Sequence, residues 1–166
     1  MPRREVVIMI FTDIQHALRH MRIHLNSNWK NIKQVQISTY GIWTGIGPDG
    51  NFRNSGAESQ EFIKAVNSSD LKADLIVGNT NRQIKKKIQT TQRIYKNINV
   101  YTSQDNHAKY IIFSDQYAML GSANLTDSEW TEMIWCGYLS DKEYEQTQAS
   151  HMAVVLNHKK SKRVKV

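Results

Sequence analysis

Apolar and polar residues alternate along the chain in stretches that predict strands and helices in turn. The apolar run at 6–11 predicts a strand. Residues 13–29 follow it with apolar side chains three or four positions apart, the spacing of one helical face. Residues 35–43 and 73–80 are rich in β-branched, aromatic or other apolar residues, and each predicts a strand. Between them, residues 57–67 again have helical spacing.

The second half of the chain continues this alternation. A basic helix is expected over 81–94, and a long final helix over 141–160. The expected strands are residues 98–103, 110–113, 117–120 and 132–140. Strands that alternate with helices indicate an α/β domain, with a mixed sheet flanked by helices. We expect one domain over 1–158 and a basic C-terminal tail over 159–166.

Composition narrows the class of protein. The chain has 166 residues, of which 40% are hydrophobic, and this suits one globular domain with a full core. No apolar run approaches the ~20 residues of a membrane span, and no cleavage site follows the first apolar run. We therefore expect neither a membrane partner nor a signal peptide, and a cytoplasmic location. The single cysteine, Cys136, excludes an internal disulfide and is expected in the core.

The formal net charge of +7 changes this picture, because a basic surface favours polyanions. Basic residues cluster between Arg82 and Lys96, where Lys85, Lys86 and Lys87 are consecutive, and again in the tail. The same basic residues would also be found on a solvent-exposed helix face and in a basic tail that bind no partner. We expect Lys85, Lys86 and Lys87 to bind the phosphates of a nucleic acid.

The strands expected at 110–113 and 117–120 are close enough in sequence to form a hairpin, and this hairpin would carry polar residues at one end. His107 and Lys109 are two positions apart, so both side chains leave the same face of an extended chain. Ser122 and Asn124 have the same spacing. If the two strands pair through the turn at 114–116, His107 and Lys109 lie opposite the segment from Gly121 to Asn124. Gly121 would let a backbone or a ligand approach closely.

These residue types suit a phosphodiester. His107 could act as a nucleophile or a general acid, and Lys109 could place a positive charge on the non-bridging oxygens. Ser122 and Asn124 could donate hydrogen bonds to the same oxygens. No cluster of acidic residues and histidines with metal-ligand spacing lies nearby. We therefore expect a metal-independent reaction that uses no cofactor.

At these residues the chain resembles the phospholipase D superfamily, whose signature is H-x-K-x4-D-x6-G-S-x-N. Its elements stand here as His107-Ala-Lys109 and Gly121-Ser122-Ala-Asn124, with the family spacing between His107 and Gly121. The resemblance implies a phospholipase D/nuclease-like sandwich. It also implies catalysis through a phosphohistidine.

The chain departs from the family pattern at two positions. The place of the family aspartate holds Ser114, and Asp115 follows it as the candidate for the same orienting role. The place of a family glutamate that hydrogen-bonds the catalytic histidine holds Trp135. Glu132 is the nearest substitute, which we include among the catalytic candidates, and Glu129 is the next.

Only one copy of the motif is present, whereas family catalysis uses two histidines. Short members with one motif assemble the site across a homodimer, so the resemblance implies a homodimeric endonuclease that cleaves DNA or RNA. Trp130 and Trp135, beside the motif, are candidate interface anchors. Two alternatives stay open: a binding module that has lost turnover, and a phospholipase or phosphatidyl-transferring enzyme.

Two further groups of residues have more than one interpretation. His16, His20 and His24 share one helical face, which suits a metal site, or a stripe that is solvated or faces nucleic acid. Tyr40 lies near two other aromatic residues, Trp43 and Phe52, beside a predicted loop at 44–56. These three could stack on a base or pack in the core.

Overall fold

The computed structural model describes residues 8–40, 57–78, 89, 92–123 and 132–163, with the backbone alone for 159–163. The elements in chain order are β1 (Met9–Phe11), α1 (Ile14–Asn28), β2 (Gln34–Thr39), α2 (Ala57–Ser68), β3 (Lys72–Val77), β4 (Ile98–Thr102), β5 (Tyr110–Phe113), β6 (Tyr117–Gly121), β7 (Ile134–Tyr138) and α4 (Asp141–Arg163). Asp13 starts α1 as its N-cap, because its Oδ1 accepts a hydrogen bond of 3.0 Å from the backbone N–H of His16.

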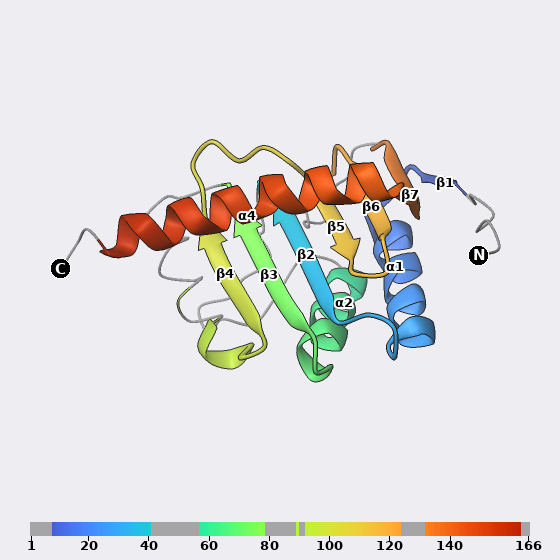
Figure 1. The fold of residues 1–166 in the computed structure, drawn as a ribbon. Helices are drawn as coiled ribbons and strands as arrows, with labels where there is room; N and C mark the ends of the chain where they lie inside the picture. Colours follow the sequence, from blue (N-terminus) through green and yellow to red (C-terminus); the bar gives the residue numbers. More distant parts are fainter. Residues whose placement is uncertain (1–7, 41–56, 79–88, 90–91, 124–131, 164–166) are drawn as a thin grey trace.

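One mixed sheet organises the described residues, with seven strands in the order β1-β7-β6-β5-β2-β3-β4 (Figure 1). The neighbours β2, β3 and β4 are parallel, whereas β5 pairs antiparallel with β2 and begins an antiparallel half. Parallel strands place their carboxyl ends at one edge of the sheet, and an antiparallel neighbour begins there. The segment that enters β5 therefore lies beside the segments that leave β2 and β3.

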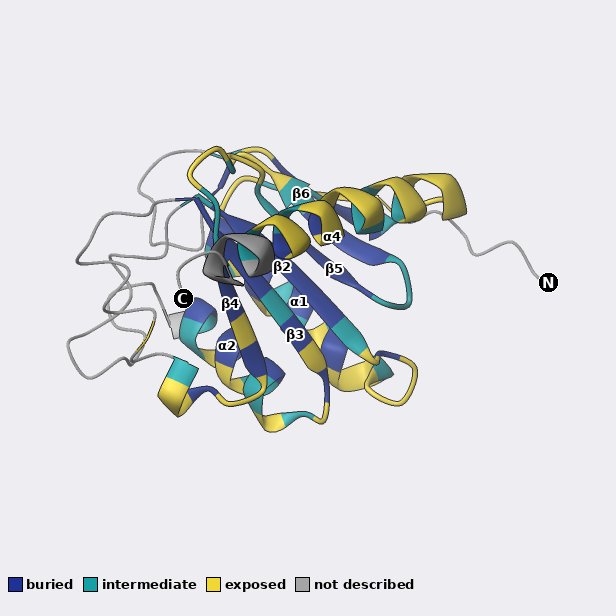
Figure 2. Cartoon of the chain, turned by 60° about the vertical axis from the view of Figure 1, so that its left-hand side comes forward, coloured by how far each residue is buried: buried dark blue, intermediate teal, exposed yellow. Residues whose placement is uncertain are grey.

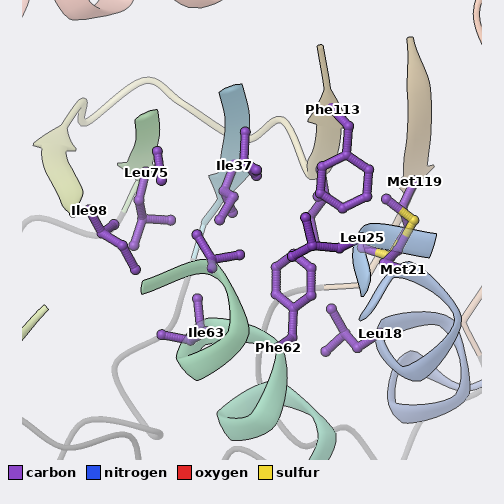
Figure 3. Close-up of a cluster of buried hydrophobic side chains, with 14 of the residues drawn as sticks. Leu18, Met21, Leu25, Ile37, Phe62, Ile63, Leu75, Ile98, Phe113 and Met119 are labelled. Carbon is purple, nitrogen blue, oxygen red and sulfur yellow. The ribbon is translucent and has the colours of Figure 1, made fainter. Parts of the chain in front are cut away.

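The main core lies on the face of the sheet covered by α1 and α2 (Figure 3). Alternate residues of the strands, such as Ile37, Leu75 and Phe113, point to this face and are fully buried. The ring of Phe62 from α2 lies 6.4 Å from that of Phe113, between centroids. Burying a side chain of this size contributes roughly 1.5–3 kcal/mol, and this face holds the largest apolar cluster of the described residues.

The opposite face is covered by α4, and this interface is more polar (Figure 2). The buried Gln36 of β2 donates a hydrogen bond of 2.7 Å to Gln148 of α4. The hydroxyl of Tyr110 lies 2.8 Å from Nδ1 of His151 in the same helix. Of the helices that the structure describes, none is long and apolar enough to span a membrane.

The predicted fold class, a mixed sheet with helices on both faces, is confirmed, and the predicted hairpin has the expected pairing. The strand expected at 6–11 is confirmed only over β1, and residues 6 and 7 lie outside the described residues. Most of the helix expected at 81–94 also lies outside them. The last helix continues to Arg163, into the segment expected to be a tail.

Burial of His151 makes stability depend on pH. Its side chain is fully buried, and among the described residues Nε2 has no hydrogen-bond partner. Burial lowers the pKa of His151 to about 4 and raises the pKa of Tyr110 to about 12. The imidazole is therefore neutral near pH 7, and the Tyr110 hydroxyl donates a hydrogen bond to it. The unfolded chain binds more protons than the native chain between pH ~6.5 and ~4, so stability falls as the pH drops through this range.

We predict that His151→Gln reduces this loss of stability. The glutamine side chain cannot take up a proton but could still accept a hydrogen bond from Tyr110. Urea unfolding at pH 7 and pH 4.5 should show a loss about 2–3 kcal/mol smaller in His151→Gln than in the wild-type chain. His16→Gln, at a side chain that is 75% exposed, should leave the loss unchanged. Equal losses in the wild-type and His151→Gln chains would contradict the prediction.

Candidate active site

The polar residues of the motif meet at one end of the β5–β6 hairpin. Tyr110 pairs with Leu120, and the backbone N–H of Gly121 donates a hydrogen bond of 3.3 Å to the carbonyl of Lys109. This register places the segment with His107 and Lys109 opposite the one with Gly121 and Ser122, as the alternation predicted. The segment lies at the edge of the sheet where β2 and β3 end.

His107 is exposed to solvent, and its ring has a defined neighbour. The ring of Tyr40, which directly follows β2, stacks on it with centroids 4.8 Å apart and planes 10° from parallel. The ammonium group of Lys109 donates a hydrogen bond of 2.9 Å to the carbonyl of His107. The ammonium group of Lys109 therefore contacts the backbone of His107, whose side chain is accessible to solvent.

A network of hydrogen bonds anchors the segment that carries His107. The side chain of Asn106 donates to the Ser38 hydroxyl at 2.9 Å, and that hydroxyl donates to the carbonyl of Ala108 at 2.8 Å. Ser38 is buried, so both flanks of His107 are fixed to β2. At the end of β3, a Cβ on Gly78 would lie 2.0 Å from the carbonyl oxygen of Asn106, so this close approach requires glycine.

The other half of the site is held by β7. A Cβ on Gly121 would lie 2.6 Å from the carbonyl oxygen of Met133, so glycine lets the two strands approach. The hydroxyl of Ser122 donates a short hydrogen bond to the carboxylate of Glu132 and accepts one of 3.3 Å from the N–H of Met133. The single hydroxyl hydrogen of Ser122 is thus directed to Glu132. For Ser122 to donate to a phosphate oxygen, this bond would have to open.

Asp115 lies at the opposite end of the hairpin, in the turn between β5 and β6. Its carboxylate pairs with Nε2 of His24 in α1 at 2.8 Å, and it accepts a hydrogen bond of 3.2 Å from the N–H of Tyr117. Both side chains of the Asp115–His24 pair are at most 10% exposed. The neighbouring Ser114 accepts from the N–H groups of Lys33 and Gln34. The structure therefore places Asp115 where it holds the turn, apart from His107.

The three histidines of α1 do not form one solvated stripe. That prediction is right for His16, which is exposed, and wrong for His24, which is paired with Asp115 and stacked on Tyr117 with centroids 4.0 Å apart. His20 is half-buried against the Tyr117 hydroxyl, and burial lowers its pKa. The hydrophobic period of α1 buries Leu18, Met21 and Leu25, and residues on the flank of that face are partly buried with it. No group of three possible metal ligands occurs among the residues described here.

Several predicted residues lie outside the described part of the chain. They are Trp43, Phe52, Lys85, Lys86, Lys87, Asn124, Glu129 and Trp130. Trp135, the other candidate interface anchor, is partly buried against the apolar cluster under α4. Cys136 is buried in the core as predicted, and burial raises its pKa to about 12.

Residues 3–159 match the protein family described as cardiolipin synthase, PLD-like domain. This match covers nearly the whole chain and includes every described residue of the hairpin. Among curated protein sequences, none matches the chain significantly.

Solved structures share the fold over most of the chain. NucT from Helicobacter pylori is 18% identical with a TM-score of 0.61, and covers 91% of this chain and 96% of its own. Nuc from Salmonella typhimurium, a phospholipase D family member, is 15% identical with a TM-score of 0.64, and covers 93% and 96%. TrmBL2, an archaeal chromatin protein that binds DNA, is 10% identical with a TM-score of 0.53, and covers 92% and 52%.

We predict that Asp115→Ala destabilises the fold with little effect on turnover. The change leaves the ring nitrogen of the buried His24 without its hydrogen-bond partner, which costs roughly 1–3 kcal/mol. Urea unfolding should show this loss, while kcat for the residual folded protein, assayed at low temperature, should stay within about twofold of wild type. Asp70→Ala removes an exposed carboxylate and should change stability by less than ~0.5 kcal/mol. A large fall in kcat with unchanged stability would instead give Asp115 an orienting role in catalysis.

Proposed function

The chain belongs to the family described as cardiolipin synthase, PLD-like domain, and from this we propose that it is a phosphodiesterase that cleaves nucleic acid without a metal ion. One observation carries the proposal: the hairpin register brings His107 and Lys109 together with Gly121 and Ser122 on an accessible edge of the sheet. An imidazole nucleophile beside a fixed cation is what attack on a phosphodiester requires. The site uses no cofactor.

In the proposed reaction, a ring nitrogen of His107 attacks phosphorus, and the bond from phosphorus to the leaving oxygen breaks. His107 of the partner subunit gives its proton to that oxygen. Lys109, Ser122 and Asn124 hold the phosphoryl oxygens, and the Ser122 hydroxyl leaves the carboxylate of Glu132 when the substrate binds. Water then attacks the phosphohistidine, with His107 of the partner subunit now acting as the base.

The formal net charge of +7 supports nucleic acid as the substrate. We propose that Lys85, Lys86 and Lys87 bind the phosphate backbone, and that the unit is a homodimer with its two-fold axis between the two copies of His107. A two-fold axis brings identical surfaces together, so one motif supplies the two histidines that the reaction needs.

Two observations favour other functions. The family description names cardiolipin synthase, which favours phosphatidyl transfer as the reaction. Engagement of the Ser122 hydroxyl by Glu132 favours a module that binds phosphate without turnover. Release of headgroup from lipid vesicles would identify phosphatidyl transfer. Tight binding of nucleic acid without cleavage would identify a binding module.

We expect cleavage of single- or double-stranded DNA or RNA to proceed in EDTA. Lys109 supplies the positive charge at the phosphoryl oxygens, so removal of divalent metal should leave the rate unchanged. His107→Ala should lower the rate at least ~100-fold, whereas His16→Ala, at an exposed histidine outside the proposed machinery, should keep it. Loss of cleavage in EDTA with recovery on adding magnesium would refute the proposed reaction.

Mixing subunits tests the shared site. Heterodimers of wild type and His107→Ala hold one copy of His107, so they lack either the nucleophile or the acid. After subunit exchange, activity should fall as the square of the wild-type fraction. Mixtures of wild type with active His16→Ala should show no fall. A linear decrease with the His107→Ala chain would mean that each subunit works alone.

A further inference from the structure

We infer that Tyr40 is a positioning residue that fixes the ring plane of His107 for attack on phosphorus; this inference rests on the proposed function. Its basis is the parallel stack of the two rings, with centroids 4.8 Å apart and planes within 10°. Tyr40 reaches the site from the end of β2, and His107 from the segment entering β5, so two neighbouring strands of the sheet build the contact.

The stack restricts the orientation of the His107 ring plane, which sets the direction of attack on phosphorus. An imidazole attacks through a nitrogen lone pair that lies in the plane of the ring. Tyr40 covers one face of the ring, so its contact does not block attack in the ring plane. Rotation of His107 would break an aromatic contact worth roughly 0.5–1.5 kcal/mol. Without the stack, an exposed histidine side chain samples several rotamers.

The aromatic face also suits the charge that develops on His107. As the bond from nitrogen to phosphorus forms, the proton on the second nitrogen stays in place, and the ring becomes positively charged. The face of a tyrosine ring attracts a nearby cation, by roughly 0.5–1 kcal/mol at an exposed site. Tyr40 therefore stabilises the ring more after attack than before it.

The surroundings of the stack are built to hold it. A Cβ on Gly78 would lie 2.7 Å from Cδ2 of Tyr40 as well as 2.0 Å from the carbonyl oxygen of Asn106. One glycine therefore lets the aromatic ring and the backbone before His107 pack together. The bonds through Ser38 fix the same backbone as well. Both rings of the stack are thus attached to rigid parts of the sheet.

The test compares Tyr40→Phe with Tyr40→Leu. Phenylalanine keeps the stack and removes the hydroxyl, whereas leucine keeps much of the volume and removes the ring. We expect Tyr40→Phe to keep kcat within about twofold, and Tyr40→Leu to lower kcat by about 10- to 100-fold with KM nearly unchanged, because a misplaced nucleophile affects the reaction step. Trp29→Leu removes an exposed aromatic ring beyond the end of α1, on an element remote from the β5 entry, and should match wild type.

A second readout does not depend on turnover. The ring current of Tyr40 should shift the imidazole proton signals of His107 upfield in the NMR spectrum, with the signals assigned from their absence in His107→Gln. Tyr40→Phe should keep this shift and Tyr40→Leu should lose it, while the folded spectrum is otherwise preserved.

The outcomes distinguish a failure of the positioning role of Tyr40 from a failure of the proposed phosphodiesterase function. A raised KM with unchanged kcat in Tyr40→Leu would mean that Tyr40 stacks on a substrate base, and the inference would fail. Equal losses in both variants would assign the effect to the hydroxyl and also overturn it. If wild type cleaves no phosphodiester, the proposed function fails and the positioning role with it. The upfield shift would still show whether the stack exists.

Discussion

The antiparallel register between β5 and β6 is the constraint that brings the polar residues of the motif together. Tyr110 opposite Leu120 fixes Lys109 opposite Gly121, and so the segment with His107 lies beside the segment with Ser122. A slip of β5 by one residue would turn Phe113 out of the core and carry Lys109 to the other face. Burial of Phe113 and Met119 under α1 and α2 thus stabilises the arrangement of polar residues at the far end of their strands.

The two ends of this hairpin have different tasks. At the turn, the buried pair of Asp115 and His24 and the capping by Ser114 attach the hairpin to α1 and to the start of β2. At the open end, side chains are accessible and are oriented by neighbours, as His107 is by Tyr40. Rigidity at one end therefore coexists with accessibility at the other.

Much of this was predictable from the sequence, and the misses have physical reasons. Continuous apolar runs identified β5 and β6, because a strand that is buried on both faces carries apolar residues at successive positions. The motif spacing then identified His107 and Lys109. The partner of Asp115 was not predictable, because His24 is 91 positions away and its burial follows from the packing of α1. The contact between Tyr40 and His107 was missed for a similar reason. Tyr40 and His107 both lie just outside strands, so the sequence pattern does not predict that their two rings face each other.

The polar interface under α4 has a consequence for how the molecule opens. The face under α1 and α2 is one continuous apolar core, whereas α4 rests on two small apolar clusters and on contacts made by Gln148 and His151. Elements held by little buried apolar area open at lower free energy than the rest of a domain. Among the helices that the structure describes, α4 should therefore open before α1, and its amides should exchange with solvent first. Tyr110, which α4 contacts, is three residues from His107, so each such opening removes a support next to His107.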